Sequence, residues 1–287
     1  MSITVPDFPK VIEIQTTTFC NAGCIICPHE YVSTIIPQDI MSRDLFLKIL
    51  REIGEKDLLL IPYLNAEPFL DPLFFERLEQ IRDSCKYVRV EISTNVSMLT
   101  PERIEQLSKY FIEDFRLSVF GFTPETHAKM MPGLKWEKIK SNLDYLVNHQ
   151  KFRKNVGQLN LVMIYFPAVT EQDISLARAY CKKNGLKLNL WGFLDRAGNV
   201  PNYSNNISKE NISGCSQNRP IERFHVSFDG KVILCCQDWK KEYILGDLNK
   251  NSIAEIWNSE EYREIREKIY NGMRSAPEIC RRCILSI

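Results

Sequence analysis

The stretch VIEIQTTTFCNAGCIIC (residues 11–27) joins a β-rich run to three closely spaced cysteines. The run over 11–16 predicts a strand, and Cys20, Cys24 and Cys27 follow it in a Cx3Cx2C spacing. In a parallel α/β barrel, the loops after the strands lie at the face where active sites are built. Thiolates are soft ligands that select iron–sulfur clusters or zinc. The sequence therefore predicts a metal site directly after the first strand.

The sequence around this stretch alternates strand signals with helix signals. The β-rich runs lie at 11–16, 58–64, 87–93, 114–120, 159–166 and 186–193. Between them are amphipathic patterns, and one of these places five apolar residues on a single helix face: Leu45, Phe46, Ile49, Leu50 and Ile53. Helix starts with a capping residue and proline are predicted at Asp71-Pro72, Thr100-Pro101 and Thr123-Pro124. This alternation predicts an α/β fold, a partial (βα)6 TIM-type barrel.

The pattern changes near residue 200. A segment rich in Asn, Ser and Gly is followed by a predicted hairpin, 223–228 and 231–236, joined by Asp229-Gly230. An amphipathic helix is predicted over roughly 252–270, before a terminal CRRC. We expect two domains, a barrel over 1–200 and a small cluster-binding domain over 201–287 built from a β-hairpin plus a helix.

Composition limits the classes of partner. The chain of 287 residues carries 37 basic and 36 acidic residues, a net charge of +1. Without a basic stripe, nucleic acid is not an expected partner. No apolar run is long enough for a membrane span or a signal peptide, so we expect a cytoplasmic protein without a membrane partner. Ten cysteines in a reducing compartment argue against disulfides and for metal or redox chemistry.

The tail carries a second group of cysteines: Cys215, Cys235, Cys236, Cys280 and Cys283. Four thiolates would complete a metal centre with no open position, and they suit structural zinc as well as an iron–sulfur cluster. Adjacent residues in a strand point to opposite faces, so Cys235 and Cys236 are not expected to share one metal. Cys85 and Cys181 lie in or at the ends of predicted helices (71–84 and 171–184), and we expect both to be inert buried thiols.

The first cysteine group, placed directly after the first strand, resembles that of the radical S-adenosylmethionine (SAM) superfamily. The resemblance implies a 4Fe–4S cluster on Cys20, Cys24 and Cys27, whose open iron binds SAM. Cleavage of SAM would then give a 5′-deoxyadenosyl radical that abstracts hydrogen from a substrate. In this chain Ile26 stands where many members have an aromatic residue.

Three further segments resemble SAM-binding motifs of that superfamily. YLNAEPFLDP (63–72) is similar to the Gly-Gly-Glu-Pro motif, with Asn65 and Ala66 in place of the glycines and Glu67 retained. By the same resemblance, Ser93 and Asn95 would line the SAM site, and Ser118 would lie near the SAM carboxylate.

The tail resembles the twitch form of the SPASM auxiliary-cluster domain. This resemblance implies a second 4Fe–4S cluster on Cys215, Cys235, Cys280 and Cys283. Cys235 is favoured over Cys236 because in related domains the ligand follows the hairpin glycine by five positions. Cys236 would then be a structural thiol or a hydrogen-atom donor.

The resemblance implies an oxidoreductase that takes hydrogen from a small-molecule substrate, similar to a sugar or cyclitol, and passes an electron to the auxiliary cluster. It also implies an external electron donor such as flavodoxin or ferredoxin. The alternatives are a radical SAM epimerase with Cys236 as donor, a peptide-modifying maturase, and a zinc- or cluster-binding module without catalysis. Arg196, after the last predicted barrel strand, is a candidate substrate contact.

Overall fold

The computed structural model describes residues 4–200, 202–204, 207–272 and 275–287. Its framework is a nine-stranded sheet in the order β6-β5-β4-β3-β2-β1-β7-β8-β9. The strands are β1 (Val11–Ile14), β2 (Leu59–Ile61), β3 (Arg89–Thr94), β4 (Ile112–Ser118), β5 (Val156–Tyr165), β6 (Lys187–Gly192), β7 (Arg223–Val226), β8 (Lys231–Ile233) and β9 (Ile244–Asp247). Pairing is parallel from β6 through β1 to β7 and antiparallel from β7 to β9. The open, mainly parallel sheet confirms the predicted α/β fold.

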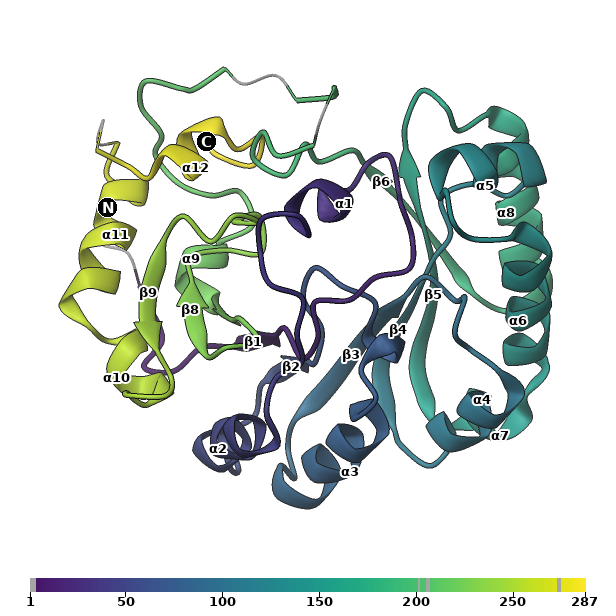
Figure 1. Ribbon diagram of the computed structural model, residues 1–287, viewed down its shortest axis with the longest axis horizontal. Helices are drawn as coiled ribbons and strands as arrows, with labels where there is room; N and C mark the ends of the chain where they lie inside the picture. Colours follow the sequence, from purple (N-terminus) through teal and green to yellow (C-terminus); the bar gives the residue numbers. More distant parts are fainter. Residues whose placement is uncertain (1–3, 201, 205–206, 273–274) are drawn as a thin grey trace.

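Helices follow the strands and cover the outer side of the sheet, as α3, α6 and α8 show in Figure 1. In the first part of the chain they are α1 (His29–Val32), α2 (Arg43–Ile53), α3 (Phe74–Ser84), α4 (Pro101–Leu107), α5 (Pro124–Met130), α6 (Trp136–Asn148), α7 (Gln150–Lys154) and α8 (Glu171–Asn184), with a 3-10 turn, η1 (Pro68–Leu70). The five apolar residues predicted for one face of α2 are all buried. The amphipathic pattern was therefore sufficient to place this helix against the sheet.

Two of the three predicted helix starts are confirmed, and one is wrong. Thr100 and Thr123 cap α4 and α5 by accepting hydrogen bonds from the backbone three residues on. Asp71 caps a turn at residues 72–73 rather than α3 itself: its carboxylate accepts from Leu73 N at 2.9 Å and pairs with buried Arg77 at 2.7 Å. The helix α3 consequently begins at Phe74.

The tail continues the barrel sheet. Strand β7 pairs in parallel with β1, and the β7–β8 hairpin with β9 extends the sheet beyond that edge. The tail helices are α9 (Arg219–Glu222), α10 (Ile253–Trp257), α11 (Glu260–Tyr270) and α12 (Glu278–Arg282). The single helix predicted over 252–270 is wrong, because Ser259 caps a new helix by accepting from Tyr262 N at 3.2 Å. The division into domains at residue 200 remains a prediction.

Side chains alternate between the two faces of the strands, as the pleat requires. On β1, Ile12 and Ile14 join the apolar core, whereas Glu13 lines a cavity on the inner face. On β3 the same division separates Ile92 from Glu91. The inner faces of β1 and β3 therefore carry carboxylates, although the strands read as β-rich apolar runs. Among the helices of the described part of the chain, none is long and apolar enough to cross a membrane.

Candidate active site

A cavity of about 330 Å³ opens where the parallel strands end, and it contains the first cysteine group. Cys20, Cys24 and Cys27 all line it, each partly exposed, and none is in a disulfide. They lie in the loop between β1 and α1. Burial raises the pKa of Cys20 to about 12 and also raises the pKa values of Cys24 and Cys27. Three thiols with raised pKa values at one wall form a donor set that a soft metal centre would stabilise as thiolates.

The backbone of this cysteine loop is held by its neighbours. Gly23 N donates to the carbonyl of Pro132 at 2.8 Å, and Ile25 N donates to that of Met130 at 3.2 Å. The ring of His29 donates from Nε2 to the carbonyl of Thr18 at 2.8 Å. These contacts fix the loop from the segment after α5 and from within the loop, so the thiols have a defined orientation before any ligand binds.

Glu67 connects the cysteine loop to β3. Its backbone N–H donates to the carbonyl of Phe19, the residue before the first cysteine, at 3.0 Å. Its buried carboxylate accepts from Thr94 Oγ1 at 2.7 Å, Asn95 N at 2.8 Å and Phe69 N at 3.3 Å. Burial raises the pKa of Glu67 to about 7, even though these hydrogen bonds favour the ionised form. Through its carboxylate and its backbone N–H together, Glu67 therefore links its own segment to the end of β3 and to the cysteine loop.

Asn65 and Ala66, which replace the two glycines of the resembled motif, both line the cavity. Asn65 has a φ of 56°, in the left-handed region that glycine and asparagine tolerate best. The backbone shape that a glycine would allow is thus retained at this position. The side-chain substitution changes the lining of the cavity but not the path of the chain.

The three polar residues predicted after β3 and β4 also line the cavity. Ser93 and Ser118 lie on adjacent strands with their hydroxyls 3.1 Å apart. Asn95 is used differently, because its Nδ2 donates to Asn21 Oδ1 at 2.9 Å and its Oδ1 accepts from Ser97 Oγ at 2.6 Å. Asn95 therefore ties the cysteine loop to the end of β3, which makes it a positioning residue.

The tail cysteines line two different cavities. Cys215, Cys235, Cys280 and Cys283 surround a second, smaller one, and all four are free thiols. Cys236 lines the first cavity instead. The prediction that both residues lie in a strand is wrong, because β8 ends at Ile233 and both follow in a turn. Neighbouring thiols nevertheless face different cavities, with ligand atoms within 4.8 Å of each other and of His225.

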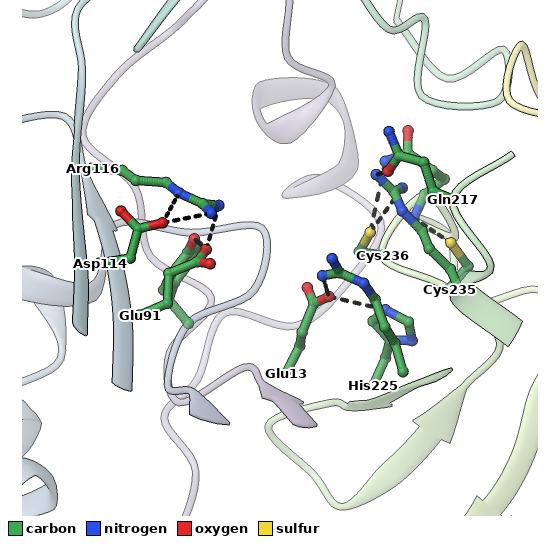
Figure 2. Close-up of polar contacts among 12 residues, drawn as sticks. Glu13, Glu91, Asp114, Arg116, Gln217, His225, Cys235 and Cys236 are labelled. Carbon is green, nitrogen blue, oxygen red and sulfur yellow. Dashed lines mark hydrogen bonds and ion pairs between the residues drawn. The ribbon is translucent and has the colours of Figure 1, made fainter. Parts of the chain in front are cut away.

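The sequence pattern did not predict the charged residues that line the bottom, or floor, of the first cavity. Arg116 pairs with Glu91 at 2.5 Å and with Asp114 at 2.7 Å, and Tyr63 Oη donates to Glu91 at 2.7 Å. Figure 2 shows this group facing the second charged group, which comes from β1 and β7. The available signal was a charged residue in the middle of a predicted strand, as Glu91 is in RVEIST.

The second floor group joins the barrel to the tail. Arg223 Nη1 donates to Glu13 Oε1 at 2.8 Å, and buried His225 lies 3.3 Å from the same oxygen. Arg219 Nη1 donates to Cys236 Sγ at 3.1 Å, and Figure 2 shows Cys236 near the Glu13–His225 pair. Glu13 and its partners thus hold β7, and with it the tail cysteines, against the barrel wall.

Family models match most of the chain. The radical SAM superfamily model matches residues 14–179, and the SPASM iron–sulfur cluster-binding domain model matches residues 215–284. The chain belongs to the radical SAM superfamily. It is a radical SAM enzyme with a C-terminal SPASM-type domain, and the two models support SAM and iron–sulfur clusters as its cofactors.

Individual relatives agree with this assignment. The chain is 23% identical over 278 residues to S-adenosyl-L-methionine-dependent 2-deoxy-scyllo-inosamine dehydrogenase from Niallia circulans, covering 96% of this chain and 92% of the relative. It superimposes on BtrN in complex with AdoMet and 2-DOIA with a TM-score of 0.66 at 16% identity, covering 99% of this chain and 94% of BtrN. Streptococcus suis SuiB bound to its precursor peptide SuiA gives a TM-score of 0.70 at 14% identity, covering 98% of this chain and 71% of SuiB. The dehydrogenase relative supports an oxidoreductase rather than a module without catalysis.

We predict that Glu67→Gln lowers the free energy of unfolding of the metal-free radical SAM enzyme by about 1–3 kcal/mol at pH 5, where the raised pKa keeps the buried carboxyl of Glu67 as neutral as the amide that replaces it. The amide nitrogen of glutamine would face one of the donors that Glu67 now accepts, from Thr94, Asn95 or Phe69. Urea unfolding measures the change. Glu79→Gln on the exposed face of α3 is the matched control, since Glu79 makes only a surface pair with Arg82. If both substitutions changed the free energy of unfolding by the same amount, the role of Glu67 in linking these segments would be contradicted.

Proposed function

We propose that the protein is a radical SAM dehydrogenase that oxidises a hydroxyl-bearing carbon of a small, polar molecule. The observation that carries the proposal is one shared cavity, lined by the first three cysteines and by Cys236 of the tail. Directly behind Cys236, its neighbour Cys235 faces a second set of free thiols. A substrate in this cavity would therefore lie between two sites with iron–sulfur ligand sets. The similarity to a cyclitol dehydrogenase over nearly the full chain supports the same reaction class.

We propose that Cys20, Cys24 and Cys27 hold a 4Fe–4S cluster with one open iron. Cys215, Cys235, Cys280 and Cys283 would hold a second, fully ligated cluster. The donor sets fit, because each consists of free thiols that line one cavity. When bound, the first cluster and SAM supply the 5′-deoxyadenosyl radical that removes hydrogen, and the second offers an acceptor for one electron.

The chain's own residues would orient SAM. We propose that the backbone carbonyls of Asn65 and Ala66 accept from its amine, in the conformation that the left-handed Asn65 allows. Ser93 and Ser118 present adjacent hydroxyls for its carboxylate. Phe120 and Trp239 line the same cavity and offer the aromatic surface that Ile26 does not.

Glu91 is the residue that we propose accepts the hydroxyl proton. Oxidation of a carbinol to a carbonyl removes one hydrogen atom, one proton and one electron, so the cavity needs a base. Burial raises the pKa of Glu91, which brings a carboxylate closer to the range useful for general base catalysis. Its Oε1 already accepts from Tyr63 and Arg116, which hold the carboxylate at the cavity floor.

An epimerase remains the second candidate, because Cys236 lines the cavity and could return a hydrogen atom to the substrate. The fold shared with peptide-bound SuiB shows fold alone and does not favour a maturase.

The experiment is a turnover of the anaerobically reconstituted full chain in D2O with SAM, a reductant such as reduced flavodoxin, and a panel of cyclitols that includes 2-deoxy-scyllo-inosamine. Dehydrogenation predicts a product lighter by two hydrogens with no deuterium on carbon. A product of unchanged connectivity that carries deuterium on carbon would replace the proposal with epimerisation.

A further inference from the structure

A larger recess continues the first cavity toward β6 and the tail. Its volume is about 760 Å³, and it shares Ile26, Ile164 and Trp191 with the first cavity. The recess therefore opens into the space where the proposed reaction takes place. A substrate that reaches the cysteine loop from this side would leave its remote end in the recess.

The charge of this recess is strongly one-sided. Arg116, Arg196, Arg219 and Arg223 line it, whereas no acidic side chain does so among the described residues. Two of the four arginines are neutralised, because Arg116 pairs with Glu91 and Arg223 pairs with Glu13. The excess positive charge of the recess thus comes from Arg196 and Arg219.

Arg219 is the more enclosed of the remaining pair. Only 9% of it is exposed, its Nη2 donates to Gln217 Oε1 at 2.6 Å, and its Nη1 donates to Cys236. Its Nε is buried and has no hydrogen-bond partner in the described structure. Arg219 also lines the second cavity beside Cys235 and Cys283, so the proposed second cluster would supply one anionic partner, and the unsatisfied Nε leaves room for a second on the recess side.

Arg196, which also lines the recess, likewise has an unsatisfied guanidinium nitrogen. Its Nε is buried without a partner, and it makes no ion pair with the described residues. Its backbone is in the left-handed region at a φ of 55°, followed by Ala197 at 53°, which is strained for residues with a side chain. The neighbouring Asp195 does not line the recess and forms no ion pair with Arg196, although the two charges interact. A strained turn thus presents an unpaired cation to the cavity.

We propose that the substrate of this radical SAM enzyme is an anion, whose carboxylate or phosphate group binds between Arg196 and Arg219. Guanidinium groups match both oxyanions with paired, charge-assisted hydrogen bonds. Trp191, which is 43% exposed and lines the recess, offers an apolar surface to the ring or chain that connects the anion to the reacting carbon. The inference rests on the proposed function for the position of the reacting carbon. It narrows the substrate class from polar molecules to acidic ones.

Isothermal titration of the reconstituted full chain with SAM present tests the proposal. The probes are quinate for a carboxylate, myo-inositol 1-phosphate for a phosphate, and myo-inositol as the neutral comparison. We expect one or both anions to bind at least about tenfold more tightly than myo-inositol. The probe that binds more tightly identifies whether the acidic group of the substrate is a carboxylate or a phosphate. Equal affinities, or no saturable binding of either anion, would overturn the proposal without need of any substitution.

Arg196→Gln then locates the site. It should remove most of the preference for the anion, whereas Arg263→Gln, an exposed arginine of α11, should leave it unchanged. The affinity for SAM is measured in the same variant. If Arg196→Gln weakened the binding of SAM as much as it weakens the binding of the anionic probe, Arg196 would be a SAM contact, and the proposal would be contradicted. Cleavage of SAM by the unsubstituted protein tests the proposed function separately, because it requires no substrate anion.

Discussion

Cys24→Ala is expected to remove about four of the about eight irons per chain that two clusters would hold, and to abolish the formation of 5′-deoxyadenosine. Cys24 is at the centre of the three thiols that line the first cavity, and two remaining ligands would not hold a 4Fe–4S cluster. The tail thiols are unaffected because they line a different cavity. Iron and sulfide analysis after anaerobic reconstitution, with chromatography of the SAM products, measures both effects.

The matched control for this substitution is Cys85→Ala. Cys85 is a buried thiol at the end of α3, and its Sγ contacts the carbonyl of Leu50 at 3.6 Å. It should keep the full iron content and SAM cleavage. If Cys24→Ala also kept both, Cys20, Cys24 and Cys27 would not be the ligands of the catalytic cluster.

Cys280→Ala has the complementary expected effect: SAM cleavage is retained, and oxidation of substrate falls to background. The substitution removes one of the four thiols around the second cavity, so the chain should lose about four irons while the first cluster stays. Without that cluster the proposed substrate radical would have no electron acceptor. Product formation and 5′-deoxyadenosine are measured in the same reaction, so that the two steps are separated.

Cys181→Ala controls for the loss of a buried thiol, since Cys181 lies within α8, away from both cavities. Because metal binding contributes to the folding of small cluster domains, a thermal melt of each variant accompanies the assay. Normal substrate oxidation by a folded Cys280→Ala protein would show that the second cysteine set is not needed for turnover.

The sequence was most informative where local pattern and packing agree. The alternation of strand and helix signals predicted the parallel sheet, and the five apolar positions of α2 are buried as expected. The cysteine loop and the Glu67 segment were also found, because their spacing and their position after a strand are visible in one dimension. These features depend on neighbours along the chain.

Features that depend on distant partners were missed. Asp71 has the sequence of a helix cap, but its carboxylate caps only the turn at Leu73 and pairs with the buried guanidinium of Arg77. The polar floor needs Glu91 and Arg116 to face one another from adjacent strands, which single strands do not show. The pairing of β7 with β1 brings Cys236 into the first cavity, across about two hundred residues of chain. Long-range pairing of this kind determines the substrate side of the site.

The central claim is that the first cavity binds SAM beside an iron–sulfur cluster and cleaves it reductively. The most direct measurement is the amount of 5′-deoxyadenosine formed by the reconstituted, reduced chain with SAM alone. We predict formation that depends on reductant and disappears in Cys24→Ala. A chain that contains about eight irons but forms no 5′-deoxyadenosine under reduction would contradict the account.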